Sequence, residues 1–134
     1  HAVYGGEMSA HHYFRDFAYC DSGMIPWLLI VELISKSGRS LSNWTCERFK
    51  KFPSSGEINF TVKDASASIM RVAEAYKGRA LSTDTMDGLS FDFGDWRFNL
   101  RKSNTEPLVR LNLESRGNAS SLDDRIAQLS ALII

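Results

Sequence analysis

The feature that most constrains the fold is an alternation of apolar and polar residues in four short segments. These segments span residues 58–62, 89–93, 96–100 and 109–113. Because successive side chains of a β-strand point to opposite faces of a sheet, this alternation predicts strands with one buried face. Asp87-Gly88 is a strong hairpin signal, and Gly94-Asp95 indicates a second tight turn. The sequence therefore predicts an antiparallel sheet.

Two helices are predicted to cover that sheet. Asp64 is suited to cap a helix whose apolar residues recur at helical spacing over 69–76. Ser121 and Asp124 resemble a capping box for a final helix. With a further strand before Asp87, the order is strand, helix, four strands, helix. We therefore expect an α+β fold in which both helices lie on the apolar face of the antiparallel sheet.

The first fifty residues have a different character. A strand-like start passes through Gly5-Gly6, which we expect to turn the backbone into a polar and aromatic loop. Asp21-Ser22 is expected to cap a helix that ends at Gly38. This helix is apolar nearly all round, so it should be covered on several sides. A second helix is predicted from Ser40 until Pro53 stops it.

The turn-rich stretch after Phe52 indicates how the chain divides into domains, and the composition of the chain excludes several functional classes. The stretch "PSSG" predicts a boundary between a first part, 1–52, and a second part, 53–134. Sixteen basic residues balance sixteen acidic residues, so no overall field favours nucleic acid or an anionic membrane. The cysteines, Cys20 and Cys46, fit neither a disulfide framework nor a zinc site. With no signal peptide and no membrane-length apolar run, we expect a cytoplasmic protein.

The loop between the last two predicted strands carries groups suited to an anion. Arg101 ends a strand on the face opposite the core, and the loop supplies Ser103, Asn104 and Thr105. A guanidinium binds phosphate oxygens through two parallel hydrogen bonds, and hydroxyl, amide and turn N–H groups add further donors. The alternative, which local physics favours, is that these residues are ordinary turn residues beside a solvated arginine.

A second polar group, within "GGEMSAHHYF", suits sugar hydroxyls. Glu7 offers two acceptor oxygens, Ser9 donates and accepts, and His11 and His12 titrate near neutrality. Adjacent histidines of an extended chain point to opposite faces, so at most one lines a given site. Alternatively, Glu7 is a surface carboxylate. The histidine pair is a weak candidate for a metal site, because no further ligands occur at useful spacing.

Together these motifs resemble the bacterial phosphomannomutase/phosphoglucomutase family, the α-D-phosphohexomutases. "GGEMSAHHYF" is similar to the family's sugar-binding loop, and "RKSNTEP" is similar to its phosphate-binding loop. The resemblance continues through "FRDFAYCDSGMIPWLL", "FPSSGEIN", "DGLSFDFGDWRFNLR" and "VRLNLESRG", over essentially the whole chain. It implies that 1–52 is the C-terminal piece of a third, sugar-binding α/β domain. Residues 53–134 would be a fourth, phosphate-binding domain of TATA-binding-protein-like topology.

The resemblance also implies a role for each loop. Sugar-hydroxyl contacts fall on Glu7 and Ser9, and His11 is a candidate for positioning or proton transfer. The phosphate clamp falls on Arg101, Ser103, Asn104 and Thr105. The implied reaction interconverts hexose 6-phosphate and hexose 1-phosphate, of mannose or glucose, through a bisphosphorylated sugar.

Other parts of the family's machinery have no counterpart in this sequence. The family's phosphoserine loop and its Asp-Gly-Asp-x-Asp-Arg magnesium motif are both missing, and the run Asp123–Arg125 is better explained as a helix start. We therefore expect no catalytic nucleophile, metal or cofactor bound by this fragment, and no activity from it alone. Magnesium, a hexose bisphosphate and the N-terminal domains are implied for the full-length enzyme.

Two other functional classes remain open from the sequence. One is a free-standing module that binds phosphosugars. The other is a nucleic-acid or protein interaction domain, suggested only by the TATA-binding-protein-like topology. Fold alone does not give function, and the balanced charge lacks the basic face that binding to a phosphate backbone needs. The sequence does not distinguish mannose from glucose phosphates.

Overall fold

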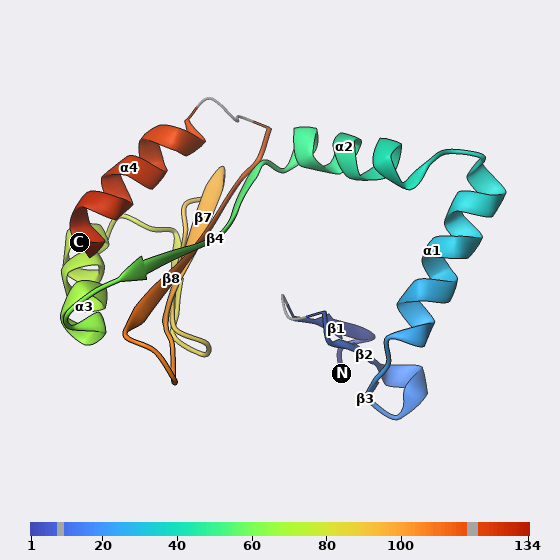
Figure 1. Cartoon of the computed structure of the whole chain (residues 1–134), viewed down its shortest axis with the longest axis horizontal. Coiled ribbons are helices and arrows are strands. Elements are labelled where there is room, and N and C mark those ends of the chain that lie inside the picture. Colours follow the sequence, from blue (N-terminus) through green and yellow to red (C-terminus); the bar gives the residue numbers. More distant parts are fainter. Residues whose placement is uncertain (8–9, 118–120) are drawn as a thin grey trace. The chain divides into compact units, whose positions relative to one another are not determined.

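The computed structural model describes residues 1–7, 10–117 and 121–134 (Figure 1). These residues form two compact units, His1–Thr45 and Cys46–Ile134. The longest helix has 14 residues, and none of the helices within the described ranges has the length and apolar character needed to cross a membrane.

The first unit begins with a small antiparallel sheet in the order β1-β2-β3. Its elements are β1 (Tyr4–Gly6), β2 (His12–Phe14), a 3-10 helix (Arg15–Phe17), β3 (Cys20–Asp21) and α1 (Met24–Ser37). The prediction that Gly5-Gly6 turns the backbone is wrong, because both glycines lie in β1 and pair with β2. A Cβ at Gly6 would lie 2.7 Å from the Tyr4 hydroxyl, which is the end of an exposed side chain.

Helix α1 begins and ends close to the predicted signals. The Ser22 hydroxyl accepts a hydrogen bond from the Ile25 N–H at 3.3 Å, whereas Asp21 belongs to β3 and binds elsewhere. Gly38, at φ 64°, caps the helix end by donating its N–H to the Ile34 carbonyl. No residue of α1 is buried within its unit.

Helix α2 (Leu41–Lys51) contains the division between the two units. It begins at the predicted place, where the Ser40 hydroxyl accepts the Asn43 N–H at 3.3 Å. It ends before Pro53, which cannot donate the hydrogen bond needed to continue a helix. The domain boundary expected after Phe52 stays a prediction.

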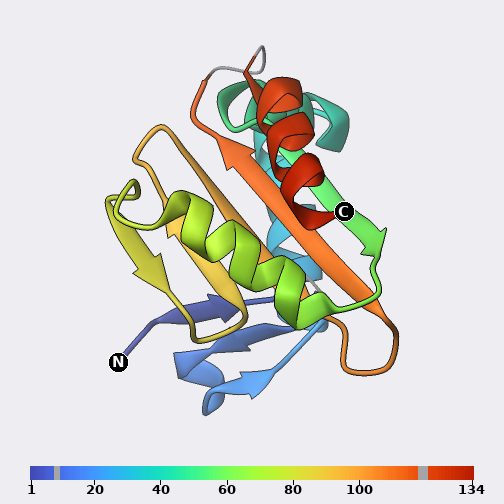
Figure 2. The ribbon, with the colours of Figure 1, turned by 90° about the vertical axis from the view of Figure 1, so that its left-hand side faces the viewer.

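The second unit has the predicted α+β architecture. Its elements are β4 (Ser54–Thr61), α3 (Ala65–Tyr76), β5 (Ser82–Asp84), β6 (Leu89–Asp92), β7 (Trp96–Lys102), β8 (Leu108–Ser115) and α4 (Leu122–Ile133). The five strands form one antiparallel sheet in the order β4-β8-β7-β6-β5. Helices α3 and α4 lie side by side on one face of it (Figure 2).

The alternation in the sequence explains which face the helices cover. Trp96, Phe98 and Leu100 of β7 are buried, as predicted. So are three apolar residues of β8 and the inner positions of both helices, namely Val109, Leu111, Leu113, Val72, Tyr76, Leu129 and Ile133. Asp64 caps α3 by accepting the Ala67 N–H at 3.0 Å. Ser121 is the N-cap residue of α4, but its side chain makes no capping hydrogen bond.

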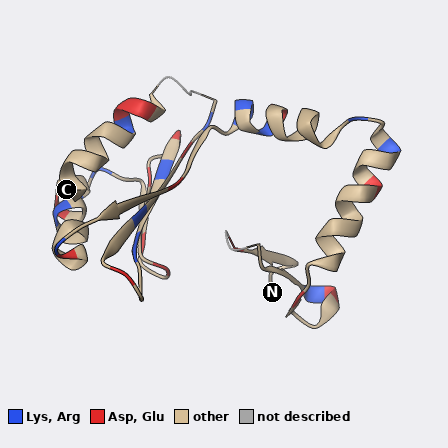
Figure 3. Ribbon diagram, in the orientation of Figure 1, with Lys and Arg blue, Asp and Glu red and all other residues tan. Residues whose placement is uncertain are grey.

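The opposite face of the sheet is polar. Basic and acidic positions are interspersed along its strands (Figure 3). At one end, Arg97 of β7 pairs with Glu114 of β8 at 2.7 Å. At the other end, between β7 and β8, lies the loop that the sequence predicted to bind an anion.

Candidate functional site

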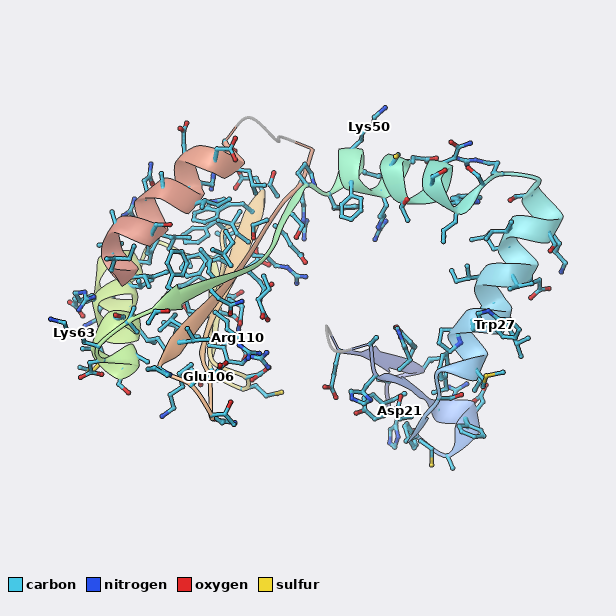
Figure 4. The ribbon with its side chains drawn as sticks, in the orientation of Figure 1. Asp21, Trp27, Lys50, Lys63, Glu106 and Arg110 are labelled. Carbon is cyan, nitrogen blue, oxygen red and sulfur yellow. The ribbon has the colours of Figure 1, made fainter. Side chains whose placement is uncertain are left out.

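The β7–β8 hairpin presents the predicted phosphate-binding residues. The strand ladder ends at the pair Lys102 and Val109, and the Ser103 N–H then donates to the Leu108 carbonyl at 2.9 Å. Residues 103–107 form the loop between the two strands, which contains Glu106 (Figure 4). Asn104 and Thr105 are exposed, so their polar groups can meet a ligand.

Ser103 organises this loop. Its hydroxyl oxygen lies 3.3 Å from the N–H groups of both Thr105 and Glu106, from which it accepts hydrogen bonds. The same oxygen lies 3.4 Å from the Thr105 hydroxyl. Two backbone donors therefore converge on one point at the loop's surface. This is turn chemistry, and the same convergence of N–H groups favours an anion oxygen.

Arg101 stands at the mouth of the loop, on the polar face. Its guanidinium lies 3.4 Å from the Asp87 carboxylate and 3.9 Å from the Glu57 carboxylate. Asp87 precedes Gly88 in the β5–β6 connection, and Glu57 lies on β4. The arginine is thus held by carboxylates from two other strands or turns, with 38% of its side chain exposed.

A pocket of about 690 Å³ joins these groups. Arg101, Lys102, Ser103, Asn104 and Thr105 all line it. The rest of the lining comes from α3, the β5–β6 connection, the start of β6 and β8, and consists of Ile69, Met70, Ala73, Thr85, Asp87, Gly88, Leu89 and Arg110. The structure therefore brings the four predicted phosphate-binding residues into one concave site.

The predicted sugar-binding residues belong to the first unit. Glu7 follows β1, and its carboxylate accepts the Tyr13 hydroxyl at 2.7 Å. This hydrogen bond to an anion stabilises the protonated phenol and raises the pKa of Tyr13. The Glu7 N–H donates to the His11 carbonyl, and Ala10, at φ 64°, completes the turn between β1 and β2. Ser9 lies outside the described residues.

His11 and His12 contact different partners, as expected for neighbouring residues of an extended chain. His11 Nδ1 lies 2.7 Å from the Asp21 carboxylate, and Tyr4 contacts the ring of His12. The other Asp21 oxygen accepts the His12 N–H at 2.8 Å. The hydrogen bond that the His11 ring donates to Asp21 raises the pKa of His11, and the nearby Glu7 carboxylate adds to this effect.

The pKa of Asp21 is shifted in the opposite direction to that of His11. Hydrogen bonds from the His11 ring and the His12 N–H both favour its charged form, so the pKa of Asp21 is lowered. The pair is therefore biased toward imidazolium and carboxylate. A histidine in this state can donate a proton or a hydrogen bond through its other ring nitrogen.

Comparison with known proteins supports the resemblance carried by these loops. A sequence model described as "Phosphoglucomutase/phosphomannomutase, alpha/beta/alpha domain III" matches residues 1–52. A second, described as "Phosphoglucomutase/phosphomannomutase, C-terminal domain", matches residues 57–132. The chain belongs to the phosphoglucomutase/phosphomannomutase family.

Individual members of the family show how much of the protein is represented. The chain is 62% identical over 132 residues to a protein of Xanthomonas campestris named "Phosphohexose mutases", covering 98% of this chain and 30% of the relative. It is 54% identical over 132 residues to a phosphomannomutase of Escherichia coli strain K12, covering 98% of this chain and 29% of that enzyme. The chain thus spans less than a third of the length of these relatives.

A solved structure of the family agrees with the fold. The crystal structure of a phosphoglucomutase/phosphomannomutase family protein from Burkholderia thailandensis matches with a TM-score of 0.65 and 26% identity. The match covers 98% of this chain and 28% of that protein.

Sequence reasoning missed several residues that contact the predicted site residues. Asp21 was interpreted as a helix cap, although it binds His11. Tyr13, Glu57 and Asp87 were not recognised as partners of the predicted site residues. Arg110 could have been found, because the alternation of β8 places it on the polar face. The described residues contain no group of His, Cys, Asp or Glu that could hold a metal ion.

Proposed function

We propose that this chain is the sugar- and phosphate-binding C-terminal part of a phosphohexomutase. The enzyme interconverts hexose 6-phosphate and hexose 1-phosphate, with mannose, glucose or both as the sugar. The family assignment supports this reaction class. The observation that carries the proposal for this chain is the pocket in which Arg101, Ser103, Asn104 and Thr105 meet.

In this proposal the hairpin loop binds the phosphate group that is not reacting. Arg101 supplies a two-pronged guanidinium, and the hydroxyls of Ser103 and Thr105 and the Asn104 amide donate to the remaining oxygens. The N–H groups of Thr105 and Glu106, which now converge on the Ser103 hydroxyl, are further donors. Such a grip contributes to rate by fixing the reacting end of the sugar against its nucleophile.

The first unit would recognise the sugar. The Glu7 carboxylate has two acceptor oxygens, which suit two adjacent hydroxyls, and Ser9 adds a donor and an acceptor. His11, whose pKa is raised by its hydrogen bond to Asp21, would position or protonate a sugar oxygen.

Two components of the reaction have no candidate in this chain. The sequence lacks the family's phosphoserine loop and its magnesium motif, and the described residues offer no metal-binding group. The nucleophile and the magnesium site therefore belong, in this proposal, to the remainder of the full-length enzyme, and the hexose bisphosphate is the intermediate of the reaction. We place that enzyme in the cytoplasm, in accord with the two free cysteines.

The direct test is an NMR titration of this chain with mannose 1-phosphate and glucose 6-phosphate. We expect the largest amide shifts at residues 101–105. If those amides do not shift, the same titration of the full-length enzyme distinguishes a loop that needs the other domains from a loop that is only a turn.

A variant test addresses catalysis. Arg101→Ala in the full-length enzyme should lower turnover by at least about tenfold, since a charge-assisted contact to phosphate is lost. Its thermal stability should stay close to that of the wild type, because its carboxylate contacts are long and solvent-exposed. Arg97→Ala is the matched control on the same strand and face. Wild-type turnover by Arg101→Ala, or its failure to fold, would count against the proposal.

A further inference from the structure

Arg101 has a second arginine directly beside it. Arg101 and Arg110 are opposite each other in the β7–β8 ladder, so both side chains leave the sheet on the same face. Like charges directly opposite each other destabilise a sheet unless a counter-charge is present. Figure 4 shows Arg110 on the side of the sheet that the helices leave open.

Glu57 is the counter-charge that the two arginines share. One of its carboxylate oxygens lies 3.9 Å from Arg101, and the other lies 3.8 Å from Nε of Arg110. Both distances are within the range of an ion pair, but they are longer than a hydrogen bond. Glu57 therefore offsets the repulsion without occupying the donors of either guanidinium.

The Nε–H group of Arg110 lacks a hydrogen-bond acceptor. Its nitrogen is buried, and within the described part of the chain it has no hydrogen-bond partner. A buried charged donor without an acceptor is costly, because water solvates it well in the unfolded chain. An oxygen brought by a ligand would remove that cost.

Arg110 also lies in the right place for such a ligand. It lines the same pocket as Arg101 and the Ser103–Thr105 loop. Among the described residues of that lining, Arg101, Lys102 and Arg110 are cationic, and Asp87 is the one carboxylate. The pocket therefore favours a dianion such as a phosphate monoester over a neutral ligand.

We propose that Arg110 is a second guanidinium of the phosphate site and that Glu57 holds the two arginines together until the phosphate binds. The inference rests on the proposed function and deepens it, because it adds a binding residue outside the hairpin loop. The ligand class is the phosphomonoester of a sugar phosphate.

The geometry of the groups allows a phosphate to replace Glu57 as the counter-charge of the two arginines. A phosphate dianion has three terminal oxygens, and each can accept more than one hydrogen bond. One oxygen can accept from Nε of Arg110 while another accepts from the Arg101 fork. Glu57 then loses its two long contacts and becomes more solvated. The phosphate replaces one carboxylate by a stronger set of charge-assisted hydrogen bonds.

The test uses this chain, inorganic phosphate and glucose 6-phosphate, with binding followed by NMR. In the wild type we expect the Nε–H signal of Arg110 to shift together with the amides of 101–105. Arg110→Gln keeps a polar side chain but removes the charge. It should lower the affinity for both ligands by about tenfold or more. Arg97→Gln is the control, because Arg97 lies on the same face but outside this pocket.

The outcomes separate this inference from the proposed function. If the amides of 101–105 shift but Arg110→Gln binds as tightly as wild type, the role of Arg110 is overturned and the proposed function stands. If Arg97→Gln weakens binding equally, the effect is general electrostatics, which also overturns it. If the wild-type chain binds neither ligand, the same comparison is made in the full-length enzyme, where an absence of shifts at 101–105 rejects the phosphate site together with the inference.

A second variant tests the role of Glu57. Glu57→Gln removes the competing carboxylate while keeping its shape, so we expect tighter phosphate binding by a few fold, with the largest gain at low salt. If Glu57→Gln weakens phosphate binding as Arg110→Gln does, Glu57 orients the arginines in the bound state. That result would overturn the exchange between Glu57 and phosphate.

Discussion

Helix α1 of the first unit and strand β7 of the second are both rich in large apolar residues. These side chains are buried in β7 but mostly exposed in α1. Phe98 and Leu100 in β7 are 2% and 0% exposed. Trp27, Leu28 and Leu29 in α1 are all more than half exposed. The second unit buries its apolar residues within one sheet and two helices, whereas α1 leaves an uncovered apolar surface in its own unit.

The difference teaches which part of the chain supplies its own stability. A one-sided alternation needs a single cover, and α3 and α4 provide it for the sheet. A helix that is apolar nearly all round needs cover on several sides. The sequence model that matches residues 1–52 describes an alpha/beta/alpha domain. We propose that other segments of such a domain cover α1 in the full-length enzyme.

The largest effect expected from this comparison is in the core of the second unit. Leu100→Ala removes a fully buried side chain and should lower the free energy of unfolding by about 2 to 5 kcal/mol. Leu29→Ala makes the same change on α1 and should alter it by less than about 0.5 kcal/mol. Urea unfolding measures both, followed through the NMR signals of β7 and β8 for Leu100→Ala and through those of α1 for Leu29→Ala.

A large effect of Leu29→Ala would contradict the comparison between the buried core of the second unit and the exposed helix α1. If Leu29→Ala destabilises this chain as much as Leu100→Ala, α1 is already covered in solution, for instance by a second copy. In the full-length enzyme, by contrast, Leu29→Ala should become more costly, because the surrounding domain would then enclose that side chain.

The same contrast explains how much of the fold was predictable. In the second unit, period-two alternation and the turn residues Asp87-Gly88 are local signals, and they located the strands. In the first unit, β2 and β3 have only three and two residues, too few for a period to emerge. Gly5-Gly6 suggested a turn because glycine permits one, but both residues pair with β2 instead. Such strand pairing is not visible in the local sequence.

A smaller effect is expected from glycines at the turns of each unit. Gly88, at φ 77°, is followed by β6, and a Cβ there would lie 2.4 Å from the Leu100 carbonyl oxygen. Gly88→Ala therefore combines backbone strain with a backbone clash and should cost about 2 kcal/mol. Gly38→Ala, at φ 64° with no atom within 4 Å of the added Cβ, should cost about 1 kcal/mol.

Urea unfolding of both variants checks this pair. Equal costs would mean that the sheet shifts to accommodate the new methyl group. The β5–β6 connection would then be softer than the close contact suggests, and Asp87, the partner of Arg101 on that connection, would be poorly fixed.

The candidate site was predictable where its residues are contiguous and not where they meet through folding. Arg101 to Thr105 follow one another in sequence, so the motif could be recognised from the sequence alone. Glu57 reaches Arg101 only because β4 joins the sheet beside β8, out of chain order. Asp21 reaches His11 across the β2–β3 pairing, which local patterns did not reveal.

The smallest expected effect concerns the first unit and its titration. Asp21→Asn removes the carboxylate that raises the pKa of His11, so that pKa should fall toward the ordinary value of 6.5. Glu7→Gln is the graded control, since Glu7 contributes less, and it should lower the pKa of His11 by a smaller amount. NMR titration of the His11 ring protons measures both shifts.

The sign of the accompanying stability change follows from the direction of each shift. Because the pKa of His11 is raised, the pair stabilises the folded unit fully below pH 6.5, and this contribution is lost as the pH rises through the raised value. Because the pKa of Asp21 is lowered, the contribution is present above pH 3.8 and is lost as the pH falls through the lowered value. Asp21→Asn should remove this pH dependence and leave that of the second unit unchanged. A His11 pKa that does not move in Asp21→Asn would show that the pair does not persist in solution, and the charged histidine proposed to face the sugar would lose its support.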